Sequence, residues 1–264
     1  DLKVFKDRNF TAGTIIQVVI QAVLYASLAI LPQFLQSMMG YTAFLSGATM
    51  MPRGLGSMTA MMMTATLSNK IDNRLMVAVG LSLIGGAGLA FGALNLQISN
   101  VNIAIPNFFM GMGMGLSMVP IMNLSVDTLK NEQMTNATGI QNLLKNIGSA
   151  IGTSLVATML TRFAQIHQYM LVGKLNELNP VFISKMQSTA GALSAYTHQS
   201  VAQYMAQYSL YGDLIKQSTL WAFIDSFRIF GLICFLVIPL MLLMKKPKKA
   251  EVIVEEVKTP AGVK

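Results

Sequence analysis

The sequence between Pro106 and Leu160 places two long apolar segments on either side of one short polar turn. Each segment is long enough to cross a bilayer, because a spanning helix takes about 20 residues. The second segment also carries polar side chains that fall on one side of a helix: Gln141, Asn142, Lys145, Asn146, Ser149 and Thr153. Since lipid cannot satisfy such groups, this side must face other helices or water. The stretch therefore predicts a multi-helix membrane protein with a polar interior.

The composition supports a membrane protein. Of the 264 residues, 53% are hydrophobic and only 11% are charged, whereas a soluble domain carries about 25% charged residues. The formal charge of +8 indicates membrane topology and contact with anionic lipid headgroups rather than nucleic acid, because the charges lie between and after the apolar runs. A single cysteine, Cys234, excludes a disulfide within the chain. The chain opens on Asp1 inside a charged segment, so we expect it to be cut from a longer protein.

We expect an all-α fold in which six transmembrane helices form one bundle. Residues 1–9 are a cytoplasmic linker, and residues 10–161 hold five spans, at 10–35, 43–67, 75–96, 106–126 and 134–161. Residues 162–217 form a partly helical extracytoplasmic loop, broken at Asn179-Pro180, with one helical extension of the fifth span and a second, separate surface helix. Residues 218–244 are the sixth span, and residues 245–264 are a basic cytoplasmic tail.

The basic residues of the short connections fix the expected orientation. With six spans they all fall on one face: Lys3, Lys6, Arg8, Lys70, Arg74, Lys130, Lys245, Lys246, Lys248 and Lys249. The two short turns on the other face have none. Lysine and arginine are enriched in cytoplasmic loops. Both ends of this segment are therefore expected inside, and residues 162–217 outside.

Two kinds of residue stand out within the predicted spans. Glycine pairs that permit close helix packing recur at a spacing of four, at Gly88/Gly92, Gly111/Gly115 and Gly148/Gly152. Arg53 follows Pro52 at mid-depth, where a charge needs a partner or a water-filled cavity. It either fixes helix packing or belongs to a transport route. Lys145 either lines the same route or extends to the headgroups.

A methionine stripe in the fourth span, at Met110, Met114, Met118 and Met122, has two interpretations. It is either ordinary packing and lipid contact or a soft wall for varied apolar ligands. We expect no metal site, because no histidine lies in any predicted span, and His167 and His198 lie in the outer loop without acidic neighbours at ligand spacing.

Residue chemistry alone leaves three classes of function. An intramembrane enzyme is disfavoured, since no H-E-x-x-H motif and no carboxylate pair lies at membrane depth. Asp127 and Asp225 lie at opposite ends of their spans, and Asp225 is three residues from Arg228, with which it can pair. One half of a transporter and a structural membrane subunit both stay open, but a structural subunit does not explain Arg53, Gln141 and Lys145 inside the membrane.

Three stretches carry a family resemblance: LPQFLQSMMGYTAFLSGATMMPRGLGSM, LSNKIDNRLMVAVGL and GMGMGLSMVPIMNLSVDTLKNEQMTNATGIQNLLKNIGSAIGTSL. Together they resemble the C-terminal half of EmrB/QacA-type drug:proton antiporters of the major facilitator superfamily. Members have fourteen spans, so the resemblance implies that this chain holds the last six. The turn SNKIDNR resembles the superfamily's cytoplasmic G-x-x-x-D-R-x-G-R-R loop but lacks its glycines and most of its arginines. A gating role for Asp72 and Arg74 is therefore not carried over.

The resemblance implies proton-driven export of bulky apolar, often cationic, compounds by alternating access. No cofactor is expected beyond the proton gradient. The candidate route residues are Arg53, Met114, Met118, Gln141, Asn142, Lys145 and Asn146. The expected partners are small-molecule drugs, the N-terminal bundle of the same chain, the lipid bilayer and, in a Gram-negative cell, a periplasmic adaptor and an outer-membrane channel. This half should supply cavity wall and substrate contacts rather than the proton path. The alternative is a half-size transporter that self-associates.

Overall fold

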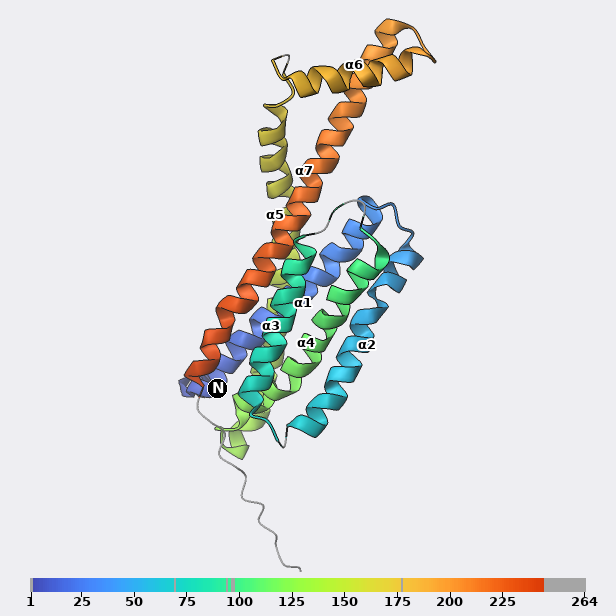
Figure 1. The fold of residues 1–264 in the computed structure, drawn as a ribbon. Coiled ribbons are helices and arrows are strands. Elements are labelled where there is room, and N and C mark those ends of the chain that lie inside the picture. Colours follow the sequence, from blue (N-terminus) through green and yellow to red (C-terminus); the bar gives the residue numbers. More distant parts are fainter. Residues whose placement is uncertain (1, 69, 94, 96–97, 177, 245–264) are drawn as a thin grey trace, which may run out of the picture.

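The structure is a computed structural model that describes residues 2–68, 70–93, 95, 98–176 and 178–244. The described residues form helices joined by short turns, with no β-strand among them. Four helices lie wholly in one bundle (Figure 1): α1 (Arg8–Ser37), α2 (Ala43–Leu67), α3 (Asn73–Phe91) and α4 (Asn100–Val126). The long helices α5 (Asn131–Val172) and α7 (Gln199–Val237) pass through the bundle and beyond it, and α6 (Pro180–Ser194) crosses their far ends. The all-α membrane fold expected from the sequence is confirmed.

Side-chain caps explain where the first three helices begin. Phe10 N donates to Asp7 Oδ1 over 2.9 Å at the start of α1. Leu45 N donates to Thr42 Oγ1 over 3.2 Å at the start of α2, and Arg74 N donates to Asp72 Oδ1 over 3.0 Å at the start of α3. Asp and Thr are preferred at such positions because they satisfy free N–H groups. Each capping residue lies in a polar connection at the boundary of a predicted span.

By length and composition, five described helices can cross a membrane: α1, α3, α4, α5 and α7. Helix α2 has the length, but its glycine, serine and threonine residues and Arg53 lower its hydropathy. Its buried residues form one stripe, at Ser46, Thr49, Arg53, Gly56, Ala60 and Thr64. This stripe packs on α4, so α2 runs beside α4 at the edge of the bundle (Figure 1). Its place as the sixth bundle helix follows from packing rather than hydropathy.

Three predicted boundaries were wrong. The third span ends at Phe91 rather than at residue 96, with Gly92 at the C-cap, where its N–H donates to the Gly88 and Ala90 carbonyl oxygens. The polar residues from Asn100 to Asn102, expected in a turn, begin α4, which leaves Pro106 inside the helix. The final α-helix ends at Val237, because Pro239 cannot continue it, and a short 3₁₀ segment (Ile238–Leu243) follows. The predicted tail at 245–264 lies outside the described residues.

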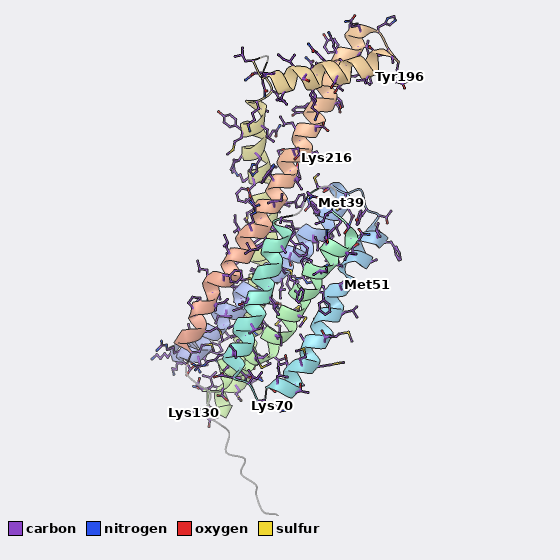
Figure 2. All side chains as sticks on the ribbon, viewed as in Figure 1. Met39, Met51, Lys70, Lys130, Tyr196 and Lys216 are labelled. Carbon is purple, nitrogen blue, oxygen red and sulfur yellow. The ribbon has the colours of Figure 1, made fainter. Side chains whose placement is uncertain are left out.

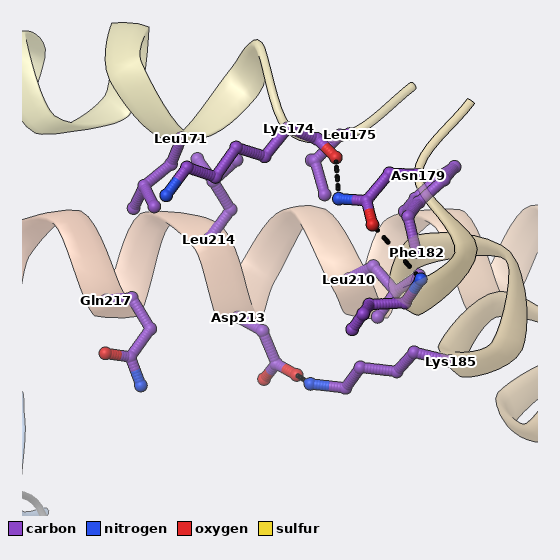
Figure 3. A pocket seen from close by; sticks show the side chains of 11 residues that line it. Leu171, Lys174, Leu175, Asn179, Phe182, Lys185, Leu210, Asp213, Leu214 and Gln217 are labelled. Atoms are coloured by element: carbon purple, nitrogen blue, oxygen red, sulfur yellow. Dashed lines mark hydrogen bonds and ion pairs between the residues drawn. The ribbon is translucent and has the colours of Figure 1, made fainter. Parts of the chain in front are cut away.

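The segment expected to form an outer loop is mostly helical. Helix α5 extends to Val172, as expected, but the separate surface helix is the first half of α7, which runs without a break into the last span. The predicted break at Asn179-Pro180 is present: Asn179 Oδ1 accepts from Val181 N over 3.1 Å, and Pro180 occupies the first helical turn of α6. Lys185 of α6 pairs with Asp213 of α7 over 3.2 Å (Figure 3). We call the part of α5 beyond Arg162, α6 and the part of α7 before Ser218 the outer arm.

Backbone contacts at glycine hold the bundle together. A Cβ on Gly111 of α4 would lie 2.0 Å from the Arg53 carbonyl oxygen of α2, and one on Gly152 of α5 would lie 2.1 Å from the Ala22 carbonyl oxygen of α1. Gly115 lies against Ala60, Gly148 against Val18, Gly88 against Gly231 and Gly92 against Arg228. All six glycines singled out in the sequence thus lie at helix contacts, where a side chain would push the backbones apart.

We predict that Gly152→Ala destabilises the protein by about 1–3 kcal/mol, because the added methyl group overpacks the contact with α1. Gly139→Ala on the same helix is the matched control, since nothing lies within 4 Å of a Cβ at Gly139. Thermal unfolding in detergent, followed by size-exclusion chromatography, measures both. Equal melting temperatures for the two variants would show that the Gly152 contact does not hold α5 on α1.

Candidate functional site

The first half of α1 buries polar side chains that carry atoms without a hydrogen-bond partner among the described residues. Thr14, Gln17 and Gln21 are spaced three and four residues apart, so they lie on one face of the helix. Gln17 is 1% exposed. The Thr14 hydroxyl and the carbonyl oxygens of Gln17 and Gln21 have no hydrogen-bond partner among the described residues. We call these three residues the α1 polar face. Buried polar groups are nearly always hydrogen-bonded, so this set requires an explanation.

Arg53 continues this polar surface toward the other end of α1. It lies near the middle of α2 and is 6% exposed. Its Nη2 donates to Ser27 Oγ of α1 over 2.8 Å and reaches the Leu24 carbonyl oxygen at 3.5 Å. Its Nη1 has no partner among the described residues. The side chain therefore crosses from α2 to α1, two helices that otherwise make little contact.

The helix contacts fix the order of these groups along the bundle. Gly148 and Gly152 of α5 meet Val18 and Ala22 of α1, so α5 runs parallel to α1. Gln141 precedes Gly148 by two turns and lies on the same face, which places it beside the start of the α1 polar face. Gln141 is buried, and both of its amide atoms lack a partner among the described residues. Buried polar groups thus run from Gln141 through the α1 polar face to Arg53.

The structure separates the candidate residues of α5. Gln141 lies on the face that packs against α1, whereas Asn142 and Asn146 are exposed on this bundle, and Lys145 is half-buried. On α4, Met114 and Met118 are both half-buried, and Met114 packs against the main core. Of the residues expected on the polar side of α5, only Gln141 joins the buried polar groups. Asn142 and Asn146 lie where another part of a protein, or water, can reach them.

Sequence reasoning missed the α1 polar face. The signal was present: two glutamines four residues apart inside an apolar span share one helix face and cannot both face lipid. It also missed Asn107 of α4, a fully buried side chain whose Nδ2 donates to the Thr49 carbonyl oxygen over 3.2 Å and whose Oδ1 has no described partner. Asn107 lies in a glycine- and methionine-rich segment, whose sequence pattern indicates helix packing and does not point to a buried polar group.

A second polar cluster ties α5 to α7 at the base of the outer arm. His167 Nε2 and Asp225 Oδ2 are 2.7 Å apart, and Arg228 Nη1 lies 3.8 Å from Asp225 Oδ1, the pairing that the sequence suggests. Arg228 Nε donates to the Gly92 carbonyl oxygen of α3 over 3.0 Å. The acidic partner of His167, fifty-eight residues away, is not visible from spacing. No metal-binding cluster occurs among the described residues.

The chain matches a family model and several known proteins. The model described as Major Facilitator Superfamily matches residues 2–153. The probable multidrug resistance protein EmrY of Escherichia coli (strain K12) is 28% identical, over 78% of this chain and 42% of its own length. The colistin resistance protein EmrB of Acinetobacter baumannii is 28% identical, over 94% of this chain and 48% of its own length. The chain thus spans about half the length of the curated relatives it matches.

A solved structure shares the fold. It is a bacterial homologue of the human lysosomal transporter Spinster, in an inward-facing and unoccupied conformation. The TM-score is 0.54 at 14% identity, over 94% of this chain and 51% of that one. At this identity the likeness bears on the fold alone.

We predict that Gln17→Leu raises the thermal stability by roughly 1–3 kcal/mol, because it removes a buried amide that lacks a partner. Gln33→Leu on the same helix, where the side chain is exposed, should change it by less than about 0.5 kcal/mol. Thermal unfolding of the purified variants in detergent tests this. A fall in stability with Gln17→Leu would mean that the amide is bonded in the folded protein.

Proposed function

The chain belongs to the Major Facilitator Superfamily, as its motifs predict, and we propose that it forms the C-terminal bundle of a proton-driven multidrug exporter. It is a multi-pass membrane protein and a transporter rather than an enzyme. The transported compounds in this proposal are small, structurally diverse and largely apolar or charged amphipathic molecules. The names of the relatives support export of toxic compounds as the activity of the whole protein.

The observation that carries the proposal is the run of buried polar groups from Gln141 to Arg53. A polar side chain without a partner costs free energy in any folded protein, and more so at membrane depth. A purely structural bundle gains nothing from keeping Gln17, Gln21 and Arg53 in this state. A transporter gains from such groups, because water or substrate satisfies their hydrogen bonds when the route is open.

Alternating access supplies the mechanism. In our proposal this bundle and a second one rock about a site near the middle of the membrane, which opens to one side and then to the other. Rigid packing of the glycine contacts lets the bundle move as one body, so that α1, with its polar face, and α2, with Arg53, move together. The proton-carrying carboxylates are assigned to the other bundle, because the described acidic residues here lie near helix ends or toward the outer arm.

The proposed orientation places the N-terminal end of the bundle in the cytoplasm of a bacterial cell. Lys70 and Lys130 lie at the same end of the bundle as the N-terminus (Figure 2). Tyr196 and Lys216 lie on the outer arm at the opposite end (Figure 2). This distribution supports an inner-membrane protein under the positive-inside rule, with the outer arm outside the cytoplasm.

The outer arm supports a partner in the extracytoplasmic space. It exposes large apolar side chains, among them Tyr169 at 84%, Tyr204 at 75% and Tyr208 at 81%. In a Gram-negative cell, a periplasmic adaptor that leads to an outer-membrane channel would cover this surface. We include both partners in the proposal on the strength of the exposed tyrosines, which are enriched at protein interfaces.

Export from energised membranes tests the function. Everted vesicles that contain the transporter, expressed from its intact gene, should accumulate ethidium when a proton gradient is present and lose it when an uncoupler collapses the gradient. Vesicles from cells without the gene serve as the control. Accumulation that survives the uncoupler would contradict proton coupling, and no accumulation of any tested compound would contradict export.

A further inference from the structure

The charge of Arg53 is not neutralised within the described bundle. Its guanidinium contacts Ser27 Oγ and the Leu24 carbonyl oxygen, both neutral acceptors. Ser27 Oγ in turn donates to the Leu24 carbonyl oxygen over 2.7 Å, so the hydroxyl proton is already used. The described carboxylates lie elsewhere: Asp7 and Asp72 at helix N-termini, Asp127 and Glu132 around the α4–α5 turn, and Asp213 and Asp225 on α7.

A structural role does not require this charge. A neutral glutamine in place of Arg53 keeps a donor for Ser27 without burying a cation, and an unpaired buried charge is strongly destabilising. Arginine stays protonated at any working pH, so it cannot lower the cost by losing its proton. The guanidinium carries five donors in a planar fork that matches a carboxylate or phosphate. Its Nη1 is buried and has no described partner, so one side of that fork is unpaired.

The surroundings of Arg53 suit an amphipathic ligand. Gly111 of α4 contacts the Arg53 backbone, and Asn107, one turn away on α4, holds a second buried polar atom without a described partner. Met50 lies one turn before Arg53 on α2, Met114 lies one turn after Gly111 on α4, and both are half-buried. Methionine side chains adapt to hydrocarbon of varied shape.

We propose that Arg53 is the anion-binding residue of the transport route, where it pairs with the acidic head group of an amphipathic substrate while methionine-rich surface takes the apolar body. This inference rests on the proposed transport function and narrows its substrate class. It places weak acids, such as long-chain carboxylates, before cationic compounds, because a bound cation would face the unneutralised guanidinium.

Matched probes test the charge requirement. The purified transporter, at its full natural length, is titrated with 11-(dansylamino)undecanoic acid and with its methyl ester, which has nearly the same size and no charge. The fluorescence of the dansyl group reports binding. The wild-type protein should bind the acid at least about tenfold more tightly than the ester, the range of a charge-assisted contact.

Three variants separate charge from shape. Arg53→Gln should lose about tenfold or more in affinity for the acid and leave ester affinity unchanged, whereas Arg53→Lys should keep part of the preference. Lys130→Gln removes an exposed cation at the inner end and should change neither. Unchanged ester binding by Arg53→Gln also shows that the variant is folded.

Three outcomes would overturn the inference. The first is a wild-type protein that binds acid and ester equally. The second is an Arg53→Gln variant that loses both probes alike, which assigns the charge to packing or to a carboxylate elsewhere in the protein. The third is an Arg53→Gln variant that keeps the full preference for the acid. Ethidium export in everted vesicles is scored separately, so failure of transport and failure of anion binding are distinguishable.

Discussion

A guanidinium held inside a membrane bundle must be neutralised, and the arrangement around Arg53 depends on this constraint. Glycine at position 111 lets α2 lie directly on α4, and only then does the Arg53 side chain reach Ser27 on α1. The link joins two helices that otherwise make little contact. The remaining charge has no counter-ion in the described bundle, so the bundle is electrostatically incomplete by itself.

The bundle and the outer arm are suited to different solvents, the bundle to lipid and the outer arm to water. Within the bundle, small residues let backbones approach, and the α1 polar face, Gln141 and Arg53 bury polar atoms that have no described partner. Beyond Asp225 the same helices α5 and α7 continue into the outer arm, where Lys185 pairs with Asp213 and tyrosines are exposed. The cluster of His167, Asp225 and Arg228 lies at the boundary between the bundle and the outer arm. The continuity of α7 across it makes the arm a rigid extension of the last span rather than a separate loop.

The order of the bundle helices, the glycine contacts and the family were predictable from the sequence, because each follows from local pattern: apolar length, spacing of four, and ordered motifs. The buried polar groups were only half predictable. Periodicity placed Gln141, Asn142 and Asn146 on one side of α5, but which of them is buried depends on how α5 rotates against α1, a property of the Gly148 and Gly152 contacts. The His167–Asp225 pair joins distant segments, and no spacing rule reveals it.

The central claim is that the α1 polar face, buried in this structure, lines the transport route and is reached by water when that route opens. It is tested most directly by single cysteines along α1, introduced into the full-length transporter after Cys234, a buried native thiol, is replaced by serine. A membrane-impermeant thiol reagent applied from the cytoplasmic side should label cysteines at 14, 17 and 21 and leave those at 12, 16 and 23, on the opposite face of α1, unlabelled. Labelling that ignores this period, or none at all at the three polar positions, would contradict the account.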